Sequence, residues 1–479
     1  MSHEGKGRAA IAPAGGARRG PGASGRRAGA RGGLRRLLSP GGWARRLGRW
    51  GGEGRAASWA VAALVTATCW GVLWLLKTVM LLDNEGGPLY FADLAWGFLN
   101  GRLDLPSTPL GAVDVSPFQG RTYAYWPPLP SIVMMPWVAL TGVKGFKMRT
   151  FGIAFASLNA GLAYFIISRF VSQLGWARVT LRWRAAAALA YALGTSNVIF
   201  GIHAIHWYVG QLVTSTSLLL GLWFGLDRRP HRRGFAALAG GTFFALAMLG
   251  RQHLVLAAPL AAYLALSDER FRLWPGPGGP LTGARAALGR GETWLRLLAA
   301  AAPYVACLAF TFAYNHARFG NWLENGLSYH NMGERFRGDY TLYGAFNVVY
   351  VPRNLYYVFA RMPFFHLLDG QTPSMGFCLF VQSPFLIMAL RRPPAPDLLP
   401  FAIALWAAVL FTWVPILMLM GTGWWQYGAR YLYDAVPILA LIGLLNLPRW
   451  RGPWPGFFAA LSVAINVAGV VLIRYQVFY

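Results

Sequence analysis

Carboxylates and aromatic residues gather in one segment, Asp83 to Pro136, which follows the first long apolar run. The segment begins DNEGGPLYFADLAWGFLNGRLDLP and continues to GRTYAYWPPLPSIVMMP. A polar segment beside a membrane helix is costly to keep near lipid, which makes it a candidate active site. Its early carboxylates belong to Asp83, Glu85, Asp93, Asp104 and Asp114.

One of these carboxylates could act as a general base, taking a proton from a hydroxyl or amine acceptor while a bond to phosphate breaks. Asp83 is the preferred candidate because it lies at the exit of the first apolar run, where the backbone is anchored, and Glu85 is the second. Either residue could instead cap the helix exit or solvate the loop. Asp93 is expected on the surface of an interfacial amphipathic helix, YFADLAWGFLNG.

Two arginines lie at the ends of later apolar runs, Arg251 in LGRQHL and Arg430 in GWWQYGARY. Arginine presents a fixed fork of donors that suits phosphate oxygens, so the pair would suit a polyprenyl-phosphate leaving group. Each arginine taken alone could equally extend its side chain to the membrane interface.

Histidines and aromatic residues are the remaining candidates for substrate binding. His203 and His206 flank a short turn, and their spacing could place both on one helical face as metal ligands or as a proton relay. Without a third ligand nearby in the sequence, interfacial hydrogen bonding is the simpler role. No metal site is assigned and no cofactor is certain, although a divalent metal is left open. The aromatic candidates for substrate binding are Tyr123, Tyr125, Trp425 and Tyr427, of which the last two also suit an aromatic belt.

The composition places these residues in a membrane protein. Hydrophobic residues make up 56% of the 479 and charged residues only 13%, and long apolar runs recur to the C-terminus. The net charge of +27 comes from Lys and Arg in the N-terminal tail and in short loops. This distribution indicates the orientation of membrane helices and does not indicate binding of nucleic acid. Cys69, Cys307 and Cys378 lie in separate segments and are expected to serve as packing residues.

The apolar runs predict an all-α polytopic protein with about eleven transmembrane helices. The uncertain segment is 127–142, which is short and contains four prolines. If it crossed, the arginines at 169–184 and 228–233 would face outward, whereas placing it at the outer interface puts both clusters in the cytosol. We therefore expect a cytosolic N-terminus and interfacial helices in the first outer loop. The expected spans are 58–82, 149–168, 184–202, 208–226, 234–250, 253–267, 294–314, 375–390, 399–420, 431–447 and 454–474.

Four regions follow from this topology. Residues 1–56 are expected to form a disordered, basic, cytosolic tail. Residues 57–314 form a transmembrane module that includes the first outer loop, 83–147. Residues 315–374 form a second extracytoplasmic loop, and residues 375–479 form the C-terminal transmembrane helices.

Several motifs resemble those of the integral-membrane GT-C glycosyltransferases, in particular the bacterial relatives of the protein O-mannosyltransferase and lipid A aminoarabinose transferase families. They are AWGFLNGRLDL, GRTYAYWPPLP, YNHARFGNWLENG and WQYGARYLYDAVP, and the resemblance covers most of residues 58–447. It implies a GT-C-like fold. It also implies transfer of a sugar from a polyprenyl-phosphate donor on the outer side of the membrane, with a carboxylate of the first loop as base.

We therefore expect a glycosyltransferase of the inner (cell) membrane whose active site is extracytoplasmic. Its expected partners are a polyprenyl-phosphate sugar donor, a glycan, lipid or protein acceptor, and membrane lipid, but no nucleic acid. A transporter or flippase of lipid-linked sugars and a non-catalytic membrane protein that keeps the fold are the alternatives. A transporter should carry ionisable residues at mid-membrane depth, whereas this sequence has nearly all of them at the ends of apolar runs.

Overall fold

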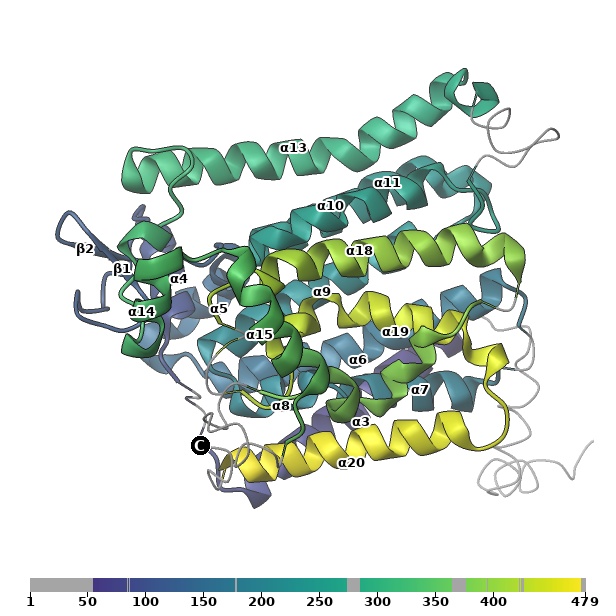
Figure 1. Ribbon diagram of the computed structural model, residues 1–479, viewed down its shortest axis with the longest axis horizontal. Helices are drawn as coiled ribbons and strands as arrows, with labels where there is room; N and C mark the ends of the chain where they lie inside the picture. The colour runs from purple at the N-terminus through teal and green to yellow at the C-terminus, as the bar shows by residue number, and fades with distance from the viewer. Residues whose placement is uncertain are drawn as a thin grey trace, which may run out of the picture. The chain divides into compact units, whose positions relative to one another are not determined.

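Apolar helices make up most of the described chain (Figure 1). The computed structural model describes residues 55–83, 85, 87–176, 179–273, 285–363, 376–393, 395–421, 423 and 426–474. The tail expected over residues 1–56 lies outside these residues except for Arg55 and Ala56, which begin helix α3. The first helix therefore starts slightly earlier than the sequence suggested.

Within the described residues, six helices are long and apolar enough to cross a membrane. They confirm the expectation of an all-α membrane protein. Helices α7 (Leu181–Leu193) and α8 (Ser196–His203), which are bent by 56°, add a seventh span if they form one broken crossing. The six are α3 (Arg55–Val79), α6 (Met148–Gln173), α10 (Arg233–Gly250), α13 (Gly291–Phe319), α18 (Leu399–Leu417) and α20 (Trp454–Arg474).

The expected count of about eleven crossings is not supported. A helix needs about 20 apolar residues to span the hydrocarbon core, and the other expected spans are too short or too polar. Helix α9 (His206–Gly225) is long enough but carries His206, Gln211 and a run of four hydroxyl residues, Thr214–Ser217. The remaining segments are short: α11 (Ala258–Leu266), α17 (Leu379–Gln382) and α19 (Val436–Leu445).

Short helices join the longer ones and precede several of them. Segment 375–390 is helical only as α17 and the 3-10 helix η7 (Pro384–Leu390). The other 3-10 helices are η1 (Pro230–Arg232), η2 (Gln252–Ala257), η3 (Leu327–Tyr329), η4 (Val348–Tyr350), η8 (Pro396–Leu398), η9 (Arg430–Ala435) and η10 (Leu447–Arg449). Helix α15 (Val351–Leu355) continues into the π-helix η5 (Tyr356–Ala360).

Small residues let the central helices approach closely. Helix α9 packs against α6 and α10, and α10 packs in turn against α13 (Figure 1). A Cβ atom on Gly221 of α9 would lie 2.9 Å from the ring of Phe244 in α10, and one on Gly241 would lie 2.3 Å from the carbonyl oxygen of Ala300 in α13. Glycine at these positions therefore permits the backbone contact that van der Waals packing in a membrane requires.

A network of buried amide and hydroxyl groups crosses the bundle. Asn197 of α8 donates to the carbonyl oxygens of Ala156 and Ala192, each at 3.1 Å. Its Oδ1 accepts from Asn159 of α6 and from the Tyr433 hydroxyl, both at 3.2 Å. One side chain thus joins α6, α8 and η9 through groups that would be costly to bury unpaired.

A set of shorter elements gathers at one end of the helices (Figure 1). It contains α4 (Tyr90–Leu99), the antiparallel strands β1 (Ser116–Phe118) and β2 (Arg121–Tyr123), and α14 (Glu334–Tyr343). Helix α5 (Leu129–Gly145) is only 17 residues long and contains Pro136. The hairpin was not foreseen from the sequence.

The expectation that Asp93 lies on a helix surface is wrong. The helix exists as α4, but Asp93 is buried because the chain after α4 folds back over it. Its carboxylate accepts the main-chain N–H of Ser107 at 3.0 Å and the hydroxyl of Thr108 at 2.7 Å. Asp93 therefore holds the chain at Ser107 and Thr108 against α4.

Replacing Asn197 with alanine should lower the free energy of unfolding by about 1–3 kcal/mol, because its buried partners lose their hydrogen bonds. Thermal unfolding of the purified protein in detergent measures this change. Ser172→Ala, at an exposed position of α6, is the control and should change stability by less than about 0.5 kcal/mol. Equal effects of the two substitutions would show that the hydrogen bonds of Asn197 do not stabilise the protein.

Candidate functional site

The carboxylate of Asp434 in η9 is almost fully buried and binds side chains from the elements around it. Arg251, which ends α10, donates its Nε–H to Oδ2 at 2.9 Å. Gln211 of α9 donates to Oδ1 at 3.0 Å, and His253 Nε2 of η2 lies 3.3 Å from Oδ2. The side chain of Asp434 is 1% exposed. These contacts tie η9, α9, α10 and η2 together at one point.

Asp434 is ionised in this environment. Burial alone would raise its pKa, but the charge of Arg251, with His253 and Gln211, outweighs burial and lowers the pKa of Asp434 to about 2. The carboxylate therefore remains negatively charged at neutral pH, and its charge offsets that of Arg251.

Arg430, also in η9, is the second arginine and is only 2% exposed. Its guanidinium carbon lies 5.0 Å from the ring centre of Trp207 and 4.7 Å from that of Tyr431. Its Nε and Nη1 atoms have no hydrogen-bond partner among the described residues. A buried guanidinium with unpaired donors is an unusual arrangement in a native structure and points to an anionic ligand.

Asp114 forms the centre of a neighbouring group. Its Oδ1 lies 3.4 Å from His330 Nε2, and its Oδ2 lies 4.0 Å from His206 Nε2. The backbone of Asp114 has a φ of +65°, a left-handed conformation that Asp and Asn adopt more readily than most residues. The N–H of Asp114 donates to the carbonyl oxygen of Asn331 at 2.9 Å. This contact joins the first polar segment to the loop after α13.

Aromatic rings enclose the two histidines. The His206 ring lies 4.9 Å from that of Tyr90 and 4.8 Å from that of Trp126, and the His330 ring lies 4.2 Å from that of Tyr125. Burial lowers the pKa of His206 to about 3, so its imidazole is neutral at pH 7. The ring nitrogens of both histidines have no hydrogen-bond partner among the described residues. They can therefore donate to or accept from a bound molecule.

The Asp114 group and the Asp434 group are neighbours. Tyr125 lies within electrostatic reach of Asp114, Tyr431 and Arg251, and the charge of Arg430 acts on His206. Trp207 connects them further, because its ring contacts both His206 and Arg430. We call this assembly the end cluster; it consists of Tyr90, Asp114, Tyr125, Trp126, His206, Trp207, Gln211, Arg251, His253, His330, Arg430, Tyr431 and Asp434.

Asp83 and Glu85, the bases expected from the sequence, have different surroundings. The carboxylate of Asp83 lies 3.3 Å from Arg149 Nη2, and Arg149 Nε donates to the main-chain oxygen of Asp83 at 2.7 Å. The Asp83 side chain is 69% exposed and also accepts the N–H of Glu85 at 3.0 Å. Asp83 is therefore paired with a buried arginine of α6.

The other predicted substrate-binding residues are divided between the end cluster and packing positions. Tyr125 and His206 belong to the end cluster, together with the predicted arginines. Tyr123 packs on Phe319, with ring centres 5.2 Å apart, and the Tyr427 hydroxyl donates to the carbonyl oxygen of Ile465 at 3.0 Å. Trp425 lies outside the described residues.

The structure does not place His203 and His206 on one helical face, a possibility that their spacing left open. Helix α8 ends at His203, Ala204 is left-handed with a φ of +43°, and α9 begins at His206. His203 Nε2 consequently lies 3.2 Å from the carbonyl oxygen of Val470 in α20, while His206 faces Asp114. The break between the two helices separates the side chains.

Asp114, His253, His330 and Asp434 were not singled out as site residues by sequence reasoning. Two weak signals were present, because His253 follows Arg251 by two residues and Asp434 follows Arg430 by four. Nothing in the sequence pairs Asp114 with His330, since their contact depends on a left-handed residue and on a loop more than 200 residues away.

The end cluster can hold an anion and accept a proton, since it contains carboxylates, imidazoles and guanidinium donors that have no partner among the described residues. Among the described residues, no group of three or more His, Cys, Asp or Glu side chains is arranged to bind a metal ion. No protein-family model and no curated protein sequence matches the chain.

Removing the carboxylate of Asp434 should destabilise the protein by about 3 kcal/mol or more, because the charge of Arg251 would remain partly buried without its partner. Thermal unfolding of Asp434→Ala in detergent measures the loss. Asp397→Ala, which removes an exposed carboxylate in η8, should leave the unfolding temperature nearly unchanged. An Asp434→Ala variant as stable as the parent would show that the buried ion pair does not organise this end of the helices.

Proposed function

We propose that the chain is a membrane glycosyltransferase that moves a sugar from a polyprenyl-phosphate donor to a lipid, polysaccharide or protein acceptor at the extracytoplasmic face, with a GT-C-like fold. The observation that carries this proposal is the end cluster, in which the Asp114 carboxylate faces His206 and His330. Trp207 contacts both His206 and Arg430, whose Nε and Nη1 have no partner among the described residues. Transfer of a sugar from a phosphate requires a group that accepts the proton of the acceptor and a nearby group that binds the departing phosphate.

The arginines would bind the donor phosphate. Arg430 offers Nε–H and Nη1–H, a fork that can donate to two phosphate oxygens. Arg251 contacts Asp434 through Nε, so its terminal amino groups can reach a further oxygen. Both guanidinium groups would stabilise the charge that develops as the bond between the sugar and the phosphate breaks.

The geometry favours Asp114 over Asp83 as the general base. Asp114 adjoins the groups that would bind the phosphate, whereas the Asp83 side chain is paired with Arg149 and is 69% exposed. In the proposed reaction an acceptor oxygen attacks C1 of the sugar and transfers its proton to Asp114. The bond from C1 to the phosphate oxygen breaks at the same time, and polyprenyl phosphate leaves with the bonding electrons.

The Asp114→Asn variant should lose transfer activity by a factor of about 100 or more, because the amide cannot accept the proton. Asparagine also tolerates the left-handed backbone at this position, so the fold should persist. The matched variant Asp83→Asn should lose less than about tenfold. The assay is transfer from polyprenyl-phosphate sugars in proteoliposomes, with the unfolding temperature of each variant as a control.

The reverse order of effects would return the role of base to Asp83, as the sequence suggests. Full activity in both variants would reject a carboxylate base from the first outer loop. Absence of transfer by the unmodified chain with any polyprenyl-phosphate sugar would reject the proposed reaction.

A further inference from the structure

A cavity of about 460 Å3 lies between α6, α7, η7, α19 and α20, and it is lined mostly by apolar side chains. Alanines of α7 and α20 line it together with larger apolar side chains. Representative lining residues are Ile166, Trp183, Met388, Leu441 and Ala459. Its dimensions and lining suit a hydrocarbon chain.

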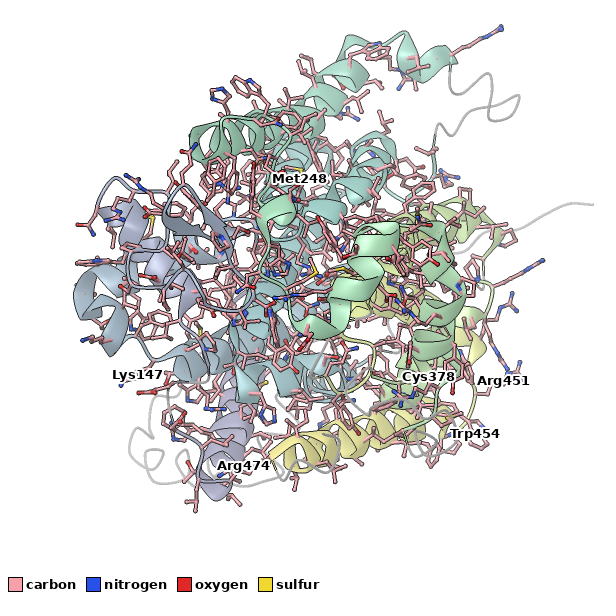
Figure 2. All side chains as sticks on the ribbon, turned by 60° about the vertical axis from the view of Figure 1, so that its left-hand side comes forward. Lys147, Met248, Cys378, Arg451, Trp454 and Arg474 are labelled. Atoms are coloured by element: carbon pink, nitrogen blue, oxygen red, sulfur yellow. The ribbon has the colours of Figure 1, made fainter. Side chains whose placement is uncertain are left out.

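Basic residues surround a hollow that adjoins this cavity. Trp450 lines both the cavity and the hollow, which has a volume of about 590 Å3. The other lining residues of the hollow are Arg391, Arg449, Arg451, Trp454 and Phe458. Among the described residues that line either space, none is acidic. Figure 2 shows Arg451 and Trp454 together at one edge, across the protein from Lys147.

Trp450 lies at the junction of the two spaces. The guanidinium carbon of Arg391 lies 4.4 Å from the centre of its ring, and Arg391 Nη1 donates to the main-chain oxygen of Arg449 at 2.9 Å. The indole Nε1–H of Trp450 is buried and has no acceptor among the described residues. An unpaired indole donor beside several arginines is complementary to an anionic group at the mouth of an apolar cavity.

This place is distant from the end cluster. Asp434 lies two residues before the start of α19, and Arg449 lies four residues after its end. The ten residues of α19 between these two points span about 15 Å at 1.5 Å per residue. The hollow and the end cluster therefore lie toward opposite ends of α19.

We propose that the cavity and the hollow form one binding site for an anionic membrane phospholipid. One acyl chain occupies the cavity, and the phosphate contacts Trp450 and the arginines at positions 391, 449 and 451. Basic pockets between membrane helices recognise anionic headgroups in this way. The site is separate from the proposed transfer reaction, because it uses none of the residues of the end cluster.

Native mass spectrometry of the delipidated protein in detergent, titrated with phosphatidylglycerol, tests the site. One molecule should bind, and phosphatidylcholine should bind at least tenfold more weakly. The double variant Arg449→Gln/Arg451→Gln should bind phosphatidylglycerol roughly 25-fold more weakly, from about fivefold per arginine. Arg121→Gln, an exposed change in the β-hairpin, should leave the affinity unchanged.

A second pair of variants tests the cavity. Ala459→Phe places a ring in the apolar space and should weaken phosphatidylglycerol binding even though the arginines remain. Ala460→Phe changes the neighbouring exposed position and should not. Unfolding temperatures show whether each variant keeps its fold.

Several results would overturn the proposal. One is equal binding of phosphatidylcholine and phosphatidylglycerol. Another is binding of phosphatidylglycerol that neither set of variants weakens. A third is a dimer of the chain that carries no bound lipid. Tighter binding of polyprenyl phosphate, with displacement of phosphatidylglycerol, would assign the site to a different lipid and would equally overturn the phospholipid assignment.

Discussion

The buried carboxylate of Asp434 is the constraint on which the polar end of this protein depends. Two arginines, Arg251 and Arg430, lie close to it at the ends of apolar helices, where their charges are costly to remove from water. Asp434 balances one of these charges and binds Gln211 of α9 at the same time. Gln211 also donates to the main-chain oxygen of Arg430 at 3.0 Å, so the position of Arg430 follows from that of Asp434.

The rest of the bundle is consistent with this arrangement. Its helices approach closely where glycines such as Gly221 and Gly241 remove side-chain bulk, and neutral hydrogen bonds such as those of Asn197 join them in the interior. Close packing therefore sets the positions of the helices, while the ion pair of Asp434 and Arg251 sets the arrangement at the polar end. The left-handed Asp114 then brings the first polar segment against the loop after α13.

Much of the fold could be predicted from the sequence because long apolar runs have few alternatives to helices in a membrane. The number of spans was overestimated because apolar composition alone does not reveal where a helix breaks, as at Ala204 or within segment 375–390. Arg251, Arg430, His206 and Tyr125 could be identified because polar residues at helix ends are conspicuous. Asp114 and His330 could not be paired, since their contact is set by tertiary structure.

The glycosyltransferase account rests on one claim, that the end cluster breaks a bond between a sugar and a phosphate. The most direct measurement places the purified chain in sealed vesicles with a labelled polyprenyl-phosphate sugar and follows two quantities separately. These are the release of free polyprenyl phosphate and the movement of intact donor across the bilayer. The account predicts release that depends on an added acceptor, without movement of the donor. Movement of intact donor without release would contradict the account and indicate a flippase.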